Sequence, residues 1–281
     1  MAPLIPRVHF FEIDDQPWFP TFLRVLVQNC LTQAWRTTTP PLKVPPAHMV
    51  ANILIDNLGA ALSSYMFIDF CAGGGGPTLY IERVVNAHLR DRGEPPVDFV
   101  LTDLHPKIAA RDHVARRNPR ITYESESVDA SRAPEKLVRR GKKVMRLFNL
   151  SFHHFDDPLA RKVLKDTVET SHGFAIFELP DRSLPSCLTV LMLGIGSVFS
   201  APLLAWRWKS PAMLFFSLLL AFVMVFDGIV SSLRVRTPEE IDALLRSCGA
   251  DTTGWEVQSG NQMHLRPWGC LNWVICRPRE N

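Results

Sequence analysis

One stretch of the chain combines an acidic residue with a dense run of glycines, in an order suited to binding a ligand. Asp69 ends an apolar run, and small residues follow at alternate positions. These small residues are Cys71, Gly73 and Gly75. Glycine permits sharp bends and a close approach of the backbone to a ligand, and Pro77 suits the first turn of a helix. The pattern predicts a buried parallel strand, a tight loop and a helix, with free backbone amides facing a cofactor.

The spacing of these residues excludes two common nucleotide-binding motifs. A dinucleotide fold needs the order G-x-G-x-x-G, but Thr78 stands where the third glycine counted from Gly73 would fall. No lysine follows the glycines, as a phosphate-binding loop requires. The order acid-x-small-x-Gly-x-Gly instead resembles motif I of the class I S-adenosylmethionine (SAM)-dependent methyltransferases. Cys71 departs from that motif, where glycine is commonest, and a purely structural glycine turn is the alternative.

The resemblance extends to the ends of later strands and implies further cofactor contacts. Asp103 ends the second strand, where the acid of the family accepts both ribose hydroxyls, and Leu104 follows it. A carboxylate suits that role because it is an acceptor only, although a helix N-cap or turn residue is the alternative. Val128 and Asp129 match the position of the adenine contacts of the family. Asn149, at the end of the fourth strand, completes the predicted cofactor set.

Two histidines after the fourth strand are the candidate catalytic residues. His153 and His154 lie in Ser151–Pro158, which resembles the loop after strand four in small-molecule methyltransferases, including the quinone-biosynthesis type. Asn149–Phe152 only loosely resembles the Asn-Pro-Pro-Tyr box of amino-group methyltransferases, which argues against a planar nitrogen substrate. With a hydroxyl or phenol acceptor, His153 would take the proton, with His154 next, because imidazole titrates near neutral pH. A carboxylate or thiolate acceptor needs no base, and the histidines would then only position it.

The chain as a whole predicts an α/β fold. At 281 residues it is long enough for one large domain or two small ones. Strands and helices alternate over residues 65–182, and residues 237–281 add a helix and a closing pair of strands. This order indicates a Rossmann-like, doubly wound sheet of the class I methyltransferase type. Residues 1–64 are predicted to form an N-terminal helical cap, which either covers the substrate side or packs on the sheet edge.

Residues 183–233 interrupt this pattern with two apolar runs. Ser183–Trp206 carries no charge, and Ser210–Leu233 carries only Asp227. Arg207–Lys209 separates the two runs. Each run is long enough to cross a bilayer, which takes roughly 20 residues. We therefore predict a membrane helical hairpin, either spanning or dipping, inserted after strand five; two buried core helices are the soluble alternative. Asp227 is either an interfacial charge or a contact to the substrate or to the partner helix.

The composition limits which binding partners and which cellular compartment are expected. The net charge is +3, the isoelectric point is about 8.6 and no block of Lys and Arg is present, so nucleic acid is not an expected partner. The 6 cysteines are scattered without a C-x-x-C pair, so neither a zinc site nor a disulfide framework is expected. Reduced thiols in a cytosolic setting are the default. The N-terminus lacks the apolar core of a signal peptide.

Together these features predict a membrane-anchored, SAM-dependent methyltransferase that acts on a lipophilic small molecule or a lipid. The hairpin would feed an apolar acceptor to the site from the bilayer, and membrane lipid is the expected partner. The catalytic part would face the cytosol, where the cofactor is made. The alternatives are a non-catalytic membrane adaptor that keeps the fold, or other chemistry, such as cyclisation of a bound metabolite.

Overall fold

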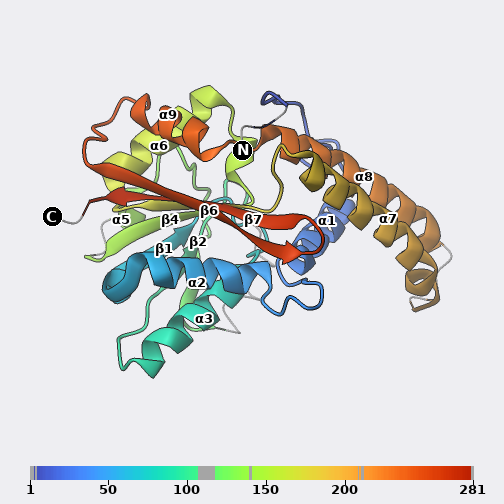
Figure 1. Cartoon of the computed structure of the whole chain (residues 1–281), viewed down its shortest axis with the longest axis horizontal. Coiled ribbons are helices and arrows are strands. Elements are labelled where there is room, and N and C mark those ends of the chain that lie inside the picture. Colours follow the sequence, from blue (N-terminus) through green and yellow to red (C-terminus); the bar gives the residue numbers. More distant parts are fainter. Residues whose placement is uncertain are drawn as a thin grey trace.

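A computed structural model of the chain describes residues 3, 5–106, 118–138, 141–207, 209 and 212–279. Among them, a 7-stranded sheet has the order β3-β2-β1-β4-β5-β7-β6 (Figure 1). The strands are β1 (Tyr65–Asp69), β2 (Phe99–Leu101), β3 (Ile121–Tyr123), β4 (Lys143–Asn149), β5 (Phe174–Glu178), β6 (Trp255–Leu265) and β7 (Gly269–Pro278). β1 to β5 are parallel, and β7 runs antiparallel to both of its neighbours. The predicted doubly wound sheet and its closing antiparallel pair are confirmed.

Helices cover both faces of the sheet (Figure 1). One hydrophobic layer contains α2 (Pro46–Leu58) and α3 (Thr78–Asp91), and the other contains α6 (Asp157–Thr170) and α9 (Pro238–Arg246). Successive side chains of a strand point to opposite faces. Phe67 of β1 therefore packs in the first layer, while its two neighbours pack in the second. The shorter helices are η1 (Gly59–Ser64), α5 (Glu135–Val138) and η2 (Phe152–His154).

The helices on the second face begin at strong sequence signals. Asp156 is the N-cap of α6, and its carboxylate accepts a hydrogen bond of 2.9 Å from the backbone N–H of Leu159. α9 begins with a capping box, in which the side chains of Thr237 and Glu240 each bond the backbone of the other.

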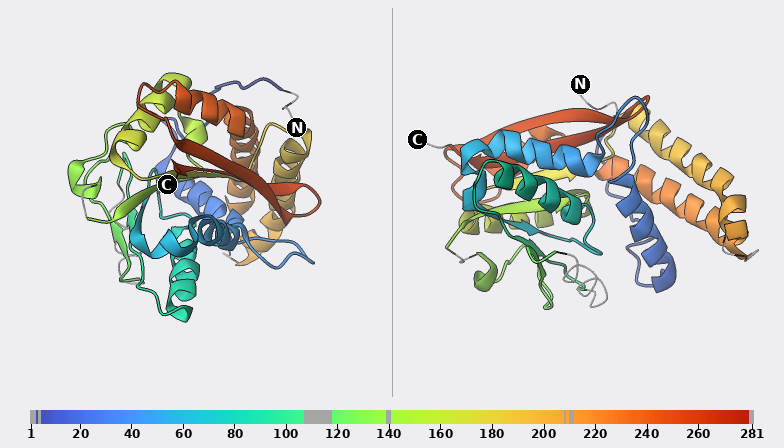
Figure 2. Two further views of the ribbon diagram at one scale, coloured as in Figure 1. Left: turned by 60° about the vertical axis from the view of Figure 1, so that its left-hand side comes forward. Right: turned by 90° about the horizontal axis from the view of Figure 1, so that it is seen from below.

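Two long apolar helices follow β5, namely α7 (Leu184–Arg207) and α8 (Ala212–Arg234). They pack closely as a hairpin: a Cβ added to Gly194 would lie 1.9 Å from the side chain of Val225. The hairpin extends away from the sheet (Figures 1 and 2). By length and composition both helices can cross a membrane, and only 19% and 28% of their apolar windows are buried. Core helices of a soluble protein would be mostly covered, whereas these two helices are mostly exposed.

The first helix of the chain, α1 (Thr21–Ala34), lies beside the hairpin rather than on the sheet (Figure 2). Leu23 and Val27 pack with Val223 of α8 in a small separate core. The rings of Phe22 and Phe216 extend this contact, with centroids 5.7 Å apart. The two main helices of residues 1–64 therefore separate, because α2 packs on the sheet and α1 on the hairpin.

An extended segment before α1, residues 7–15, runs along the C-terminal half of α8; we call it the N-terminal strap. The backbone N–H of Val8 donates to the carbonyl of Leu233 at 3.1 Å. The buried carboxylate of Asp227 accepts the backbone N–H groups of Ile13, at 2.6 Å, and Asp14, at 3.1 Å. Asp227 thus joins the hairpin to the strap, a contact that its sequence context did not suggest.

Candidate functional site

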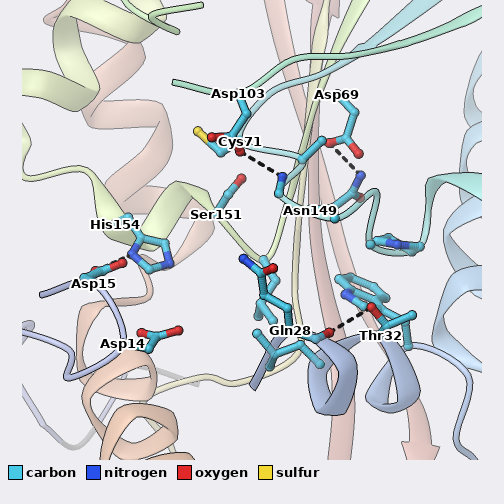
Figure 3. Close-up of a pocket in the computed structure, with 18 residues that line it drawn as sticks. Asp14, Asp15, Gln28, Thr32, Asp69, Cys71, Asp103, Asn149, Ser151 and His154 are labelled. Carbon is cyan, nitrogen blue, oxygen red and sulfur yellow. Dashed lines mark hydrogen bonds and ion pairs between the residues drawn. The ribbon is translucent and has the colours of Figure 1, made fainter. Parts of the chain in front are cut away.

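A cavity of about 340 Å³ lies at the glycine loop, where the carboxyl ends of β1, β2 and β4 meet (Figure 3). Open α/β sheets bind their ligands at this edge. Five residues of the predicted cofactor set line the cavity, namely Asp69, Cys71, Gly73, Asp103 and Asn149. Ser151 and His154, which follow β4, also line it. The remaining wall comes from the N-terminal part of the chain, with Gln28, Leu31 and Thr32 of α1 and Asp14 and Asp15 of the strap. The N-terminal segment and the loops after the parallel strands therefore build one site.

Asp69 braces the start of the glycine loop from inside the core. Its carboxylate accepts hydrogen bonds from the Thr78 hydroxyl of α3 and from Nδ2 of Asn149, the latter at 3.0 Å. Burial raises the pKa of Asp69 to about 7, against the lowering effect of these two hydrogen bonds. Asn149 retains a buried Oδ1 that has no hydrogen-bond partner among the described residues. That oxygen is an acceptor available to a ligand in the cavity.

Asp103 fixes the other side of the loop. Its two carboxylate oxygens accept the backbone N–H groups of Gly73 and His105, each at 2.8 Å. Each oxygen keeps a second lone pair, so the carboxylate can still accept ligand hydroxyls. The bond to Gly73 couples the acid at the end of β2 to the turn that follows β1 (Figure 3).

The backbone of the loop explains why its small residues are needed. Cys71 and Gly73 have φ angles of 58° and 53°, in the left-handed region. A residue with a Cβ is strained there by about 1–2 kcal/mol. This strain explains why glycine is commonest at the position of Cys71 in motif I. Burial raises the pKa of the Cys71 thiol to about 12, so it stays protonated and is not a nucleophile at neutral pH. A Cβ on Gly73 would point toward Gln28 across the cavity, 3.6 Å from its Nε2.

Four residues of the predicted cofactor set do not line this cavity. Gly75 shapes the turn through a 2.7 Å hydrogen bond to the carbonyl of Ala72. Leu104 is 49% exposed, Val128 is buried in the second hydrophobic layer, and the Asp129 carboxylate bonds Ser131. Contacts of Leu104, Val128 and Asp129 with a cofactor remain predictions.

The two candidate catalytic histidines face different cavities. His154 lines the glycine-loop cavity, with its Nδ1 3.0 Å from the Asp15 carboxylate. Burial lowers the pKa of His154, but the hydrogen bond that it donates to Asp15 and the charges of Glu12 and Asp15 outweigh this effect and raise the pKa to about 9. His153 is buried, and its Nδ1 lies 2.8 Å from the carboxylate of Glu178. It lines a second cavity, of about 640 Å³, at the foot of α7.

Stability should depend on pH through His154. Its folded pKa of about 9 exceeds the usual value of 6.5, so the protonated imidazole stabilises the fold. That contribution is complete below about pH 6.5 and is lost as the pH rises through about 9. We expect His154→Gln to lower the melting temperature most at about pH 6 and little above about pH 9.5. An equal loss at both pH values, measured by scanning calorimetry, would contradict this assignment.

Residues of the strap were not predicted to belong to the site. The buried carboxylate of Glu12 lies 3.0 Å from Nη1 of Arg234 and 3.6 Å from Nδ1 of His154. Asp14 and Asp15 line the cavity itself. The only sequence signal was the set of three acids within a short aromatic segment, and the partners that give it meaning lie more than 130 residues away.

Comparison with known proteins identifies the fold. No protein-family model and no curated protein matches the sequence. The solved structure of LepI in complex with SAM superimposes with a TM-score of 0.50 and 13% identity, over 94% of this chain and 53% of LepI. The trans-methyltransferase CalH, in complex with S-adenosylhomocysteine (SAH), gives a TM-score of 0.51 and 16% identity, over 90% of this chain and 59% of CalH. The chain thus spans little more than half the length of either protein. Its architecture is the class I methyltransferase fold that the motifs predicted.

Proposed function

We propose that the protein is a membrane-anchored, SAM-dependent methyltransferase with a lipophilic acceptor. The observation that carries this proposal is the glycine loop held between two acids, Asp69 and Asp103, at the ligand-binding edge of a methyltransferase fold. The two solved structures with this fold hold SAM or SAH, which supports SAM as the cofactor here.

The residues of the cavity fit such a cofactor. The free lone pairs of Asp103 would accept the ribose hydroxyls, and Asn149 Oδ1 would accept a further donor. When bound, SAM supplies an electrophilic methyl group on a positively charged sulfur. The task of the protein is then to align the acceptor with that methyl group and to exclude water, and orientation alone can supply roughly 7–11 kcal/mol of the barrier.

The hairpin and the second cavity support a lipophilic acceptor. Many apolar side chains point outward from the hairpin, among them Phe199 and Trp206, which are 80% and 79% exposed. A bilayer would cover such a surface. The second cavity lies where α7 begins and is lined by Leu184, Met263 and Trp268 among others. We infer that this cavity takes the apolar part of the acceptor, and that the catalytic part faces the cytosol.

The experiment is methyl transfer in membranes that carry the protein. Incubation with SAM labelled on its methyl group and a total lipid extract should give a labelled product in the organic phase. Membranes carrying Asp103→Ala are the matched control and should give none. A protein that binds SAM but labels nothing would instead fit a non-catalytic adaptor. A rearranged product without label would fit cyclisation.

A further inference from the structure

The N-terminal strap places a carboxyl group inside the glycine-loop cavity. Asp14 lines this cavity, and its side chain points toward Gln28 of α1, across the space beneath His154 (Figure 3). Its position is fixed from behind, because its backbone N–H donates to Asp227 of α8 and its carbonyl accepts Nε of Arg24 at 2.8 Å. These two contacts therefore fix the position of the Asp14 carboxyl group in the cavity.

The Asp14 carboxyl is poised to exchange a proton. Its Oδ1 is buried and has no hydrogen-bond partner among the described residues, so it can accept a donor from a ligand. Burial, followed by the charges of Asp15, Asp227 and Glu12, raises its pKa to about 7, and His154 opposes this shift. A general base works best when its pKa lies near the working pH.

Neither histidine fits the role of base as well as Asp14 does. With its pKa raised to about 9, His154 is mostly protonated at neutral pH and has no free lone pair to offer. His153 is bound to Glu178 and lines the other cavity. The cationic His154 instead pairs with Asp15.

We propose that Asp14 is the catalytic base that takes the proton of an acceptor hydroxyl. This inference rests on the proposed function. The O–H proton passes to Asp14, and the oxygen forms a bond to the methyl carbon. The C–S bond breaks with its electron pair kept on sulfur, which neutralises the sulfonium. The proton then leaves Asp14 for solvent. The charged and titratable groups that face Asp14 are Glu12 and Asp15 of the strap, Asp227 of α8, Arg24 of α1 and His154 of η2.

The test compares Asp14→Asn with wild type and with Asp98→Asn, a surface acid outside the site. SAM affinity, measured by calorimetry, should be equal in all three, because Asp14 acts on the acceptor. Single-turnover transfer of labelled methyl to the lipid extract should fall by about 10²–10⁴-fold in Asp14→Asn near pH 7. Asp14→Glu should recover part of that loss.

The pH profile separates proton transfer from a structural effect. In wild type the transfer rate should rise about tenfold per pH unit and level off as Asp14 ionises. In Asp14→Asn, the transfer rate should no longer rise with pH in the range where it rises in wild type. Asp15→Asn removes a negative charge that raises the pKa of Asp14, so its rise should move to lower pH. A merely structural role would not produce that shift.

Two results would overturn the assignment. One is a rate in Asp14→Asn within about threefold of wild type. The other is a wild-type protein that binds SAM but labels nothing in the extract, since a base would then have no acceptor to serve. A wild-type protein that does not bind SAM would refute the proposed function itself, and with it this inference. The calorimetric measurement therefore distinguishes the two failures.

Discussion

Asp103→Ala should weaken SAM binding by at least about 100-fold. The variant removes a carboxylate that would accept two ribose hydroxyls, and hydrogen bonds to a charged group contribute about 1.5–3 kcal/mol each. Because 1.4 kcal/mol is tenfold in affinity, two such bonds correspond to roughly 10²–10⁴ in Kd. Titration calorimetry of the purified protein in detergent would measure this loss directly.

The matched control for this variant lies at the other end of the same strand. Asp98 precedes β2 and pairs on the surface with Arg120 and Lys142, so Asp98→Ala should leave SAM affinity unchanged. Asp103 also bonds Gly73 and His105, so the melting temperature without SAM should be recorded for both variants. A folded Asp103→Ala protein with wild-type affinity would show that the acid is a turn residue only.

Three lysines on the outer face of the hairpin should release the protein from the membrane. Met192, Ile195 and Phe222 are 58%, 48% and 61% exposed and lie near the middle of their helices. Their replacement by lysine should therefore leave the packing intact. In a bilayer each lysine near a helix centre costs roughly 2.5–3.5 kcal/mol on insertion scales. The triple variant should appear in the supernatant after a carbonate wash, while wild type should stay in the pellet.

Lysine at exposed apolar sites outside the hairpin is the control for this experiment. Leu159 and Val44 are 37% and 36% exposed, and lysine at either position should leave the protein in the pellet. SAM binding by the triple variant would show that it is folded. If the folded triple variant still pellets with membranes and does not aggregate, the hairpin is not the anchor. A wild-type protein that washes off with salt would make α7 and α8 exposed helices of a soluble protein.

The fold could be predicted from the sequence because its signals are local. The run before Asp69, the glycines after it and the capping box at Thr237 each depend on neighbours within a few residues. The strand pairing then follows from the short connections of a doubly wound sheet. The resemblance to the methyltransferase family located Asp103 and Asn149, and both lie at the edge where the carboxyl ends of the parallel strands meet.

The acceptor side of the site could not be predicted in this way. Asp227 and Arg234 help to hold Asp14 and Asp15 at the site, and those partners lie more than 200 residues further along the chain. The two adjacent histidines were assigned to one site, but the one-turn helix η2 directs them to different cavities. Neither the distant pairing nor the direction of a side chain in a short helix is encoded in local periodicity.

The attachment of the strap to α8 also bears on the order in which the site forms during synthesis. Ribosomes complete the strap first and α8 among the last elements, since chains grow from the N-terminus. Until α8 has been made, the strap lacks the two hydrogen bonds that the Asp227 carboxylate accepts from Ile13 and Asp14. A newly made chain would therefore acquire a complete site only once its hairpin has formed. In the membrane methyltransferase proposed above, biosynthesis itself would restrict methyl transfer to chains whose hairpin is already in place.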